Sequence, residues 1–236
     1  LLLHAVCSLN LEMVKFLVEK NAPLKKNYEI CSGLFTYHAS LLFCSLYFDY
    51  KEEISLYLST LPGIDVNAGG KIDGVAGSPL FLACKSCLPV AINLLERDEI
   101  EIEQQFKSKD IANYALIKAL QMFAMAESKN KLTENHTQLI EKILEKYQSK
   151  SAQIPPDCFH YCCMCIKDTH IAELFIKFGI DPTLATTYSF LLNKNGNQPL
   201  ATYNALHCAV ATKNQKLVEH LITKYPVTVS GRSQCY

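Results

Sequence analysis

The densest group of reactive side chains is the run CFHYCCMC, residues 158–165, which is followed by His170. If this segment is helical, Cys158, Cys162 and Cys165 lie on one face of the helix. Zinc binds thiolate and imidazole ligands in a tetrahedron, so the ligand types for a metal site are present. Zinc modules usually present two separated pairs of ligands on loops, which this single run does not provide, and unpaired cysteine is commonly buried. We therefore expect packed thiols and no metal ion.

A histidine-activated cysteine nucleophile is the second chemistry that these residue types offer. His160 and the other histidines accompany eleven cysteines, but none stands in a recognisable nucleophile motif. Residues 69–71 read GGK, yet the rest of the phosphate-binding pattern G-x-x-x-x-G-K-[ST] is missing. His136 and His220 are expected at solvated helix positions. We expect no enzymatic activity and no cofactor; the alternative is a catalytic domain outside this sequence, or a cysteine-dependent activity in residues 158–165.

The composition of the chain argues against some classes of partner and favours one cellular compartment. The chain has 23 Lys plus Arg and 23 Asp plus Glu, and a nucleic-acid partner usually requires a basic surplus, so we expect no nucleic acid. No apolar run approaches the ~20 residues of a membrane span. Most cysteines lie in apolar segments, where a free thiol behaves as a small hydrophobic group in a reducing compartment. These features predict a cytoplasmic protein without a membrane span.

The elements that must position these side chains recur along the chain. Each of four stretches has a short apolar run ending in small residues, then a polar or irregular break, then a second run with leucines at helical spacing. Each run alone is too short to form a stable helix in water, so it must pack on its neighbours. Recurrence of this kind is typical of repeat proteins. The four stretches are residues 2–18, 40–58, 78–95 and 204–222.

These stretches resemble the ankyrin repeat, whose consensus opens with T-P-L-H-x-A-A and closes with L-L-x-x-G-A-D-V-N. Residues 78–80 read SPL at the T-P-L positions, and residues 63–67 read GIDVN, close to the closing motif. Residues 204–207 read NALH and residues 178–181 read FGID, which match the same two parts of the consensus. The resemblance implies that His207 ties the turn before its helix together and is structural.

The resemblance implies an all-α fold, an ankyrin-like solenoid of about six stacked helix-turn-helix repeats with long tip loops. Corresponding apolar residues of successive units are 36 to 46 positions apart, longer than the family period of about 33. We expect the additional residues of each unit in the tips, such as residues 67–77 and 186–203. The fourth unit is expected to be a divergent helical hairpin. The single solenoid spans residues 1–236, with units at residues 1–35, 36–73, 74–109, 110–153, 154–198 and 199–236.

The first unit predicts an exposed apolar end. It opens with the apolar run LLLHAV, and no polar helix precedes it in the sequence. Terminal units of a solenoid need a polar outer face. We therefore interpret the chain as a fragment of a longer protein, in which further repeats or another domain cover this end. Self-association through this end is an alternative.

Ankyrin-like stacks bind proteins mainly with a concave face formed by the tips and the first helices, so the resemblance implies a protein-interaction module. Tyr47, Phe48 and Tyr50 stand in the break between two helices, where the consensus prefers small or polar residues. Aromatic residues dominate interface hot spots, so these three are the first candidates for partner binding. The alternative is that they pack on a neighbouring tip. The tips and the first-helix ends add Tyr37, Lys71, Asp73, Lys85, Tyr188 and Lys213.

Two further expectations come from the resemblance. Asn67 is similar to the asparagine that is hydroxylated in many ankyrin proteins, and its alternative role is to form its own turn. The polar positions rich in lysine and asparagine, the long tips and the degenerate repeats are similar to ankyrin-repeat effector proteins of intracellular bacteria. That similarity implies a secreted virulence effector that binds a host protein in the host cytosol.

Overall fold

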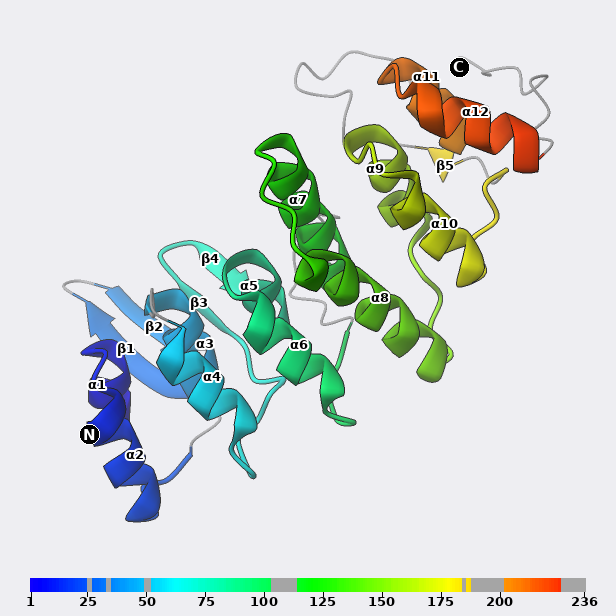
Figure 1. Ribbon diagram of the computed structural model, residues 1–236. Coiled ribbons are helices and arrows are strands. Elements are labelled where there is room, and N and C mark those ends of the chain that lie inside the picture. Colours follow the sequence, from blue (N-terminus) through cyan, green and yellow to red (C-terminus); the bar gives the residue numbers. More distant parts are fainter. Residues whose placement is uncertain are drawn as a thin grey trace. The chain divides into compact units, whose positions relative to one another are not determined.

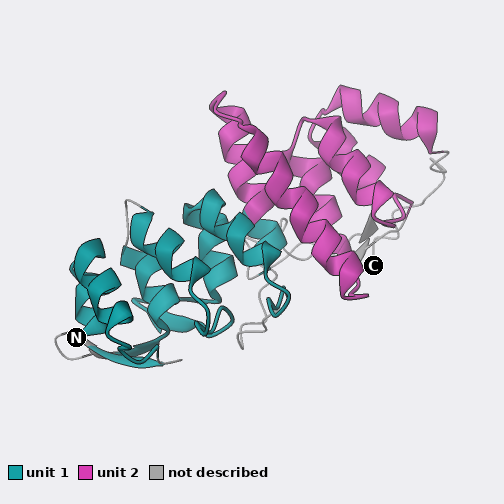
Figure 2. Cartoon of the chain, turned by 60° about the horizontal axis from the view of Figure 1, so that its bottom comes forward, with its two compact units in different colours: residues 1–118 teal, residues 119–236 magenta. Residues whose placement is uncertain are grey.

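The computed structural model describes residues 1–24, 27–32, 35–48, 52–102, 114–183, 186–187 and 202–225. This part of the chain is mostly helical, as predicted, and it also contains a small antiparallel sheet of four strands (Figure 1). The chain divides into two compact units, residues 1–118 and residues 119–236 (Figure 2). Among the described residues, no helix has both the length and the apolar character needed to cross a membrane.

The helices of the first unit form three consecutive pairs. The first helices of successive pairs contact one another, as do the second helices, so each pair packs against the next within this unit (Figure 1). One pair lies in each of the first three units that the sequence predicts. The pairs are α1 (Leu2–Cys7) with α2 (Leu11–Glu19), α3 (Leu41–Phe48) with α4 (Glu53–Thr60), and α5 (Pro79–Ser86) with α6 (Leu88–Glu96).

Helix α3 is the centre of the first unit's core. Residues 41–46 are all buried, because α1, α4 and α5 pack around this helix. A helix surrounded on several sides must be apolar on several sides, which explains why its sequence, LLFCSLYF, has no polar face. Among the buried residues 41–46, Ser45 carries the one hydroxyl, and it donates to the carbonyl oxygen of Leu42.

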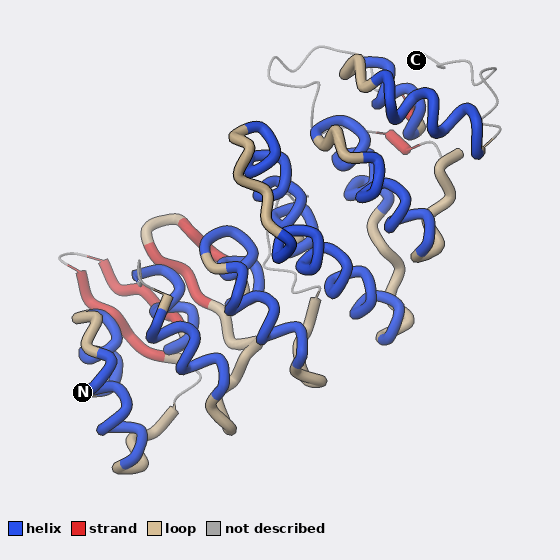
Figure 3. Tube along the Cα trace, in the orientation of Figure 1, coloured by secondary structure: helices blue, strands red, loops and turns tan. Residues whose placement is uncertain are grey.

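The four-stranded sheet corrects the prediction of an all-α fold with tip loops. Its strands are β1 (Tyr28–Ser32), β2 (Phe35–Ala39), β3 (Gly70–Ile72) and β4 (Val75–Gly77), paired antiparallel in that order (Figure 3). Asp73 and Gly74 have φ angles of 48° and 80°, the left-handed conformation that a two-residue type I′ hairpin turn requires. The Asp-Gly pair between short apolar runs therefore specifies a hairpin within residues 67–77, where we expected a loop.

The two hairpins form one sheet because strand β2 of the first pairs with strand β3 of the second. Ala39 lies opposite Gly70, and His38 lies opposite Lys71. A side chain on Gly70 would collide with Ala39 and crowd Phe43 of α3, so only glycine fits at this position. The sheet is thereby held against the core helix of the unit.

The second unit contains most of α7 and the remaining helix pairs. Helix α9 contacts α10 and α11, and α10 contacts α8 and α12. Two short strands, which lie between α10 and α11 in the sequence, pair with each other. The elements are α7 (Ala115–Ser128), α8 (Glu134–Ser149), α9 (Pro156–Cys165), α10 (Thr169–Lys177), β5 (Thr186–Thr187), β6 (Thr202–Tyr203), α11 (Ala205–Ala211) and α12 (Gln215–Lys224).

The same turn joins the helices of the first and last pairs. Leu9 and Lys213 both have a φ angle of 56° and stand one residue before the N-cap of the second helix. The next residues, Asn10 and Asn214, each accept a backbone N–H from the first turn of that helix through their side chains. Two stretches about 200 residues apart therefore fold into the same local structure, in agreement with their similar sequences, SLN and TKN.

The apolar end expected for the first unit is present. Leu1 and Leu9 are 97% and 41% exposed, and Met13 and Phe16 on α2 are 46% and 52% exposed. These side chains lie on the helix pair that has no further described pair before it.

Candidate partner-binding surface

Tyr37, Tyr47 and Asp73 come from three different elements and meet at the tip of the β3–β4 hairpin. The Tyr37 hydroxyl donates to Asp73 Oδ1 at 2.6 Å, and the Tyr47 hydroxyl donates to Asp73 Oδ2 at 3.2 Å. Each carboxylate oxygen therefore accepts one tyrosine hydroxyl. The hydrogen bonds connect strand β2, the end of helix α3 and the hairpin turn.

Local structure explains why these side chains converge. Asp73 stands in the type I′ turn, Tyr37 on the neighbouring strand β2, and Tyr47 in the last turn of α3. Phe48 follows Tyr47, and the two rings meet edge to face with centroids 4.9 Å apart and planes at 86°. We call the group Tyr37, Tyr47, Phe48 and Asp73 the hairpin-tip surface. Asp73 is exposed and the three aromatic side chains are half-buried.

Electrostatics at the hairpin-tip surface keep the Tyr37 hydroxyl protonated. The hydrogen bond to Asp73 raises the pKa of Tyr37, and burial and the negative charge of Asp73 add to the effect. Within the described part of the chain, Asp73 forms no ion pair and its carboxylate contacts are the two hydroxyls. The surface therefore presents an exposed carboxylate bound by two tyrosine hydroxyls, with the Phe48 ring packed on Tyr47.

The structure brings together several of the residues that the sequence singled out. Tyr47, Phe48 and Asp73 lie in the hairpin-tip surface, and Lys71 lies on strand β3 opposite His38. The expected alternative, contact of an aromatic residue with a neighbouring tip, also describes Tyr47, because its hydroxyl bonds to the tip residue Asp73. His38 was not singled out, although the alternation in residues 35–39 could have indicated its strand.

The other predicted contact residues lie elsewhere. Lys85 is exposed near the end of α5, and its charge lowers the pKa of Lys118, although burial is the larger cause. Lys213 stands in the left-handed turn between α11 and α12, in the second unit. Tyr50 and Tyr188 lie outside the described residues.

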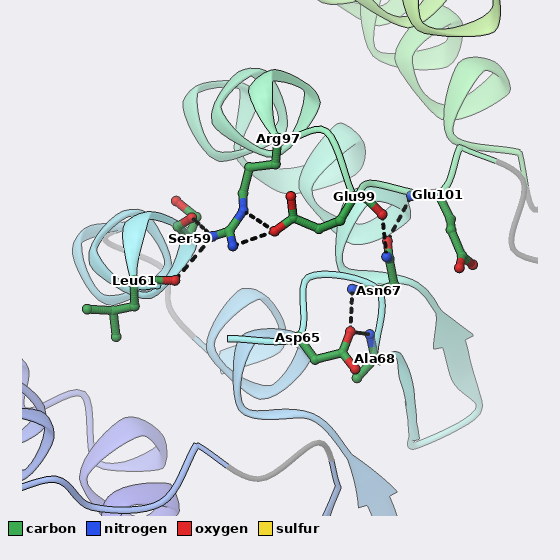
Figure 4. Close-up of polar contacts among 8 residues, drawn as sticks. All are labelled: Ser59, Leu61, Asp65, Asn67, Ala68, Arg97, Glu99 and Glu101. Carbon is green, nitrogen blue, oxygen red and sulfur yellow. Dashed lines mark hydrogen bonds and ion pairs between the residues drawn. The ribbon is translucent and has the colours of Figure 1, made fainter. Parts of the chain in front are cut away.

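Asn67 links the loops of two successive helix pairs (Figure 4). Its Nδ2 donates to the carbonyl oxygen of Glu99 at 2.7 Å, and its Oδ1 accepts the backbone N–H of Glu101 at 2.8 Å. The side chain of Asp65 accepts the backbone N–H groups of Asn67 and Ala68, both at 3.0 Å. Asp65 therefore supplies the side-chain acceptor of this turn, and Asn67 links the turn to the next loop. The turn role expected for the Asn67 side chain and its hydroxylation stay predictions.

Arg97 connects the same two loops (Figure 4). Its Nη1 donates to the carbonyl oxygens of Ser59 and Leu61 at 3.2 and 3.1 Å, and its Nε and Nη2 donate to Glu99 Oε1 at 2.8 and 2.6 Å. The guanidinium thus places a positive charge at the carboxyl end of α4, where helix carbonyls carry partial negative charge. Sequence reasoning missed this contact, because its partners Ser59 and Leu61 stand far from Arg97 along the chain.

The cysteine run is part of the interior, as expected. Residues 158–165 lie in α9, and the side chains of Cys158, Cys162 and Cys163 are at most 1% exposed. Burial raises the pKa of Cys162 and Cys163, whereas a nucleophilic cysteine needs a lowered pKa. In the part of the chain that the structure describes, no three His, Cys, Asp or Glu side chains are grouped to hold a metal ion.

His136 and His207 each belong to a capping box at the start of a helix. Asn204 Oδ1 accepts the backbone N–H of His207 at 3.0 Å, and the His207 ring folds back toward Asn204, so the expected structural role is confirmed. His136 forms a similar capping box with Thr133 at the start of α8. The prediction of a solvated position was wrong for His220, whose side chain is only 14% exposed. Its Nε2 lies 3.3 Å from Oε1 of Glu173.

In the comparisons with known proteins, the chain matches no family model and no curated protein.

Proposed function

We propose that this chain is an ankyrin-like solenoid that binds a protein partner through the hairpin-tip surface. The observation that carries the proposal is the meeting of Tyr37, Tyr47 and Asp73 at the tip of a hairpin, with Phe48 beside them. Aromatic side chains that are rigid and partly exposed are the residues that most often dominate protein interfaces.

Three features of the helix pairs support the ankyrin-like part of the proposal. A hairpin precedes α3 and another precedes α5, and the two share one sheet. Helix α5 begins at the SPL motif, where the Ser78 hydroxyl caps the N–H of Phe81 and Pro79 occupies the first turn. Asn67, in the GIDVN motif, links its loop to the loop of the next pair.

The mechanism would be recognition by a preformed surface. Ladder hydrogen bonds, the type I′ turn and two tyrosine hydroxyls fix the position of Asp73 before any partner arrives. Binding by ordered side chains loses less conformational entropy than binding by flexible ones, so more of the contact energy appears as affinity.

The similarity to ankyrin-repeat effectors favours a host protein as the partner. A cysteine-dependent activity in residues 158–165 has less support, since burial raises the pKa of its thiols.

Affinity capture from a eukaryotic cell lysate tests the proposal. The purified chain is compared with a Tyr47→Ala/Phe48→Ala variant and with Phe16→Ala, a control that removes an exposed ring from α2, outside the hairpin-tip surface. We expect a protein that the parent and the Phe16→Ala control retain and the double variant loses, while the far-UV circular dichroism of all three shows that each is folded at the temperature of the capture. Equal retention by all three chains, or no specific retention by any, would count against the proposal.

A further inference from the structure

We infer that the hairpin-tip surface recognises a lysine side chain on the partner protein. The inference rests on the proposed function and adds the chemistry of the partner's anchoring residue. It comes from the combination of one exposed carboxylate and three aromatic rings, Tyr37, Tyr47 and Phe48, in a fixed arrangement.

The carboxylate of Asp73 retains capacity for a further donor. A carboxylate has about four lone-pair sites, and the two tyrosine hydroxyls use one on each oxygen. Within the described residues no cation neutralises it: Lys71, two positions earlier, forms no ion pair with it. A cationic donor from another molecule would complete the site by charge complementarity.

The rings favour a cation over a neutral donor. The face of an aromatic ring carries negative potential, so a cation beside Asp73 is attracted by the carboxylate and by a ring face together. The rings of Tyr37 and Tyr47 are held next to the carboxylate by their hydroxyl hydrogen bonds, and Phe48 packs edge to face with Tyr47. An apolar stem attached to that cation would contact the rings as well.

The arrangement suits lysine better than arginine. An arginine fork binds best when both oxygens of a carboxylate are open to two parallel N–H groups. Each oxygen of Asp73 already accepts a tyrosine hydroxyl, so a single compact ammonium group is easier to accommodate. The four-carbon stem of lysine also supplies the apolar surface that the rings can cover.

A purely structural role is the competing explanation. In that case Asp73 fastens the hairpin tip to α3 and β2 through the two hydroxyls, and no ligand is involved. Asp73→Asn separates the two explanations. Asparagine tolerates the left-handed turn. Its Oδ1 accepts one tyrosine hydroxyl and its Nδ2 donates to the oxygen of the other, so both contacts are kept while the charge is removed.

The direct test uses the full chain with 13C-labelled tyrosine rings, assigned with the Tyr37→Phe and Tyr47→Phe variants. It is titrated with Nα-acetyl-lysine methylamide and, separately, with the norleucine analogue, which lacks the ammonium group. We expect saturable shifts of the Tyr37 and Tyr47 ring signals with the lysine compound, weakened roughly fivefold or more by Asp73→Asn. Equal shifts with norleucine, or titrations that Asp73→Asn leaves unchanged, would overturn the inference.

The partner protein captured from the lysate provides a second test of the lysine site. Asp73→Asn should weaken its binding to the chain by roughly fivefold and reduce its salt dependence, whereas Lys71→Gln, the control, should not weaken it. If the partner is lost with Tyr47→Ala/Phe48→Ala but keeps its affinity with Asp73→Asn, the proposed function stands and the lysine site is wrong. If no partner is captured, the proposed function fails, and the tyrosine titration still decides the lysine site.

Discussion

The side-chain oxygen of Asn67 accepts the backbone N–H of Glu101 at 2.8 Å, across 34 positions of the sequence. The same carboxamide donates to the carbonyl oxygen of Glu99. One side chain therefore satisfies a donor and an acceptor of the following loop. The link joins the loop that follows α4 to the loop that follows α6 within the first unit.

Asn67→Ala is expected to lower the free energy of unfolding by about 1–3 kcal/mol, because it leaves a backbone N–H and a carbonyl of the next loop without this partner. Urea unfolding followed by circular dichroism measures the change. Asn135→Ala, an exposed change on α8, serves as the control and should alter stability by less than about 0.5 kcal/mol. Equal effects of the two changes would show that the link contributes nothing.

Arg97→Ala is expected to cost about 1–3 kcal/mol of stability, since it removes a charged donor from two carbonyls at the end of α4. A double-mutant cycle with Glu99→Gln isolates the contribution of the ion pair, which is partly exposed and should contribute less than about 1 kcal/mol. Lys129→Ala, on an exposed position, is the matched control. An Arg97→Ala variant as stable as this control would contradict the role assigned to Arg97.

The cysteines of α9 are expected to react slowly with iodoacetamide at neutral pH. Burial raises the pKa of Cys162, Cys163 and Cys165, so each is present almost entirely as the unreactive thiol. Mass spectrometry of the native chain should show rates at least about tenfold below that of free cysteine, and comparable rates after unfolding. A cysteine in residues 158–165 that reacts faster than free cysteine would revive the enzymatic alternative.

Stability should decline as the pH rises above about 9. Burial raises the pKa of Cys44 from 9.0 to about 12, so between these values the unfolded chain loses a proton that the folded chain keeps. Deprotonation then favours the unfolded state, and this thiol alone should cost about 1 kcal/mol between pH 9 and pH 10. Urea midpoints measured across this range should fall less steeply for Cys44→Ala than for the parent. Parallel curves would contradict the assigned shift.

Much of the helical structure could be predicted from the sequence, because short apolar runs, caps and turns are local signals. The SPL motif begins α5, NALH begins α11, and one helix pair lies in each predicted unit. The sheet was missed, although the Asp73-Gly74 turn is a local signal for a hairpin. The pairing of β2 with β3 was harder to foresee, because it depends on the close approach of Ala39 and Gly70.

The residues of the candidate site could be predicted from the sequence, but the contacts between them could not. All four members, Tyr37, Tyr47, Phe48 and Asp73, were predicted as contact residues from their type and their position in the repeat. That Tyr37 and Tyr47 both donate to Asp73 depends on hairpin register and on the end of α3, neither of which a residue pattern specifies. Arg97 was missed for the same reason, since its partners come from another helix pair.

Hydrogen exchange of the chain with and without its captured partner tests the central claim most directly. Partner binding at the hairpin-tip surface should slow exchange in residues 35–48 and 70–77 and leave residues 2–19 unchanged. Slowed exchange confined to other segments, with residues 35–48 and 70–77 unaffected, would show that the partner binds elsewhere.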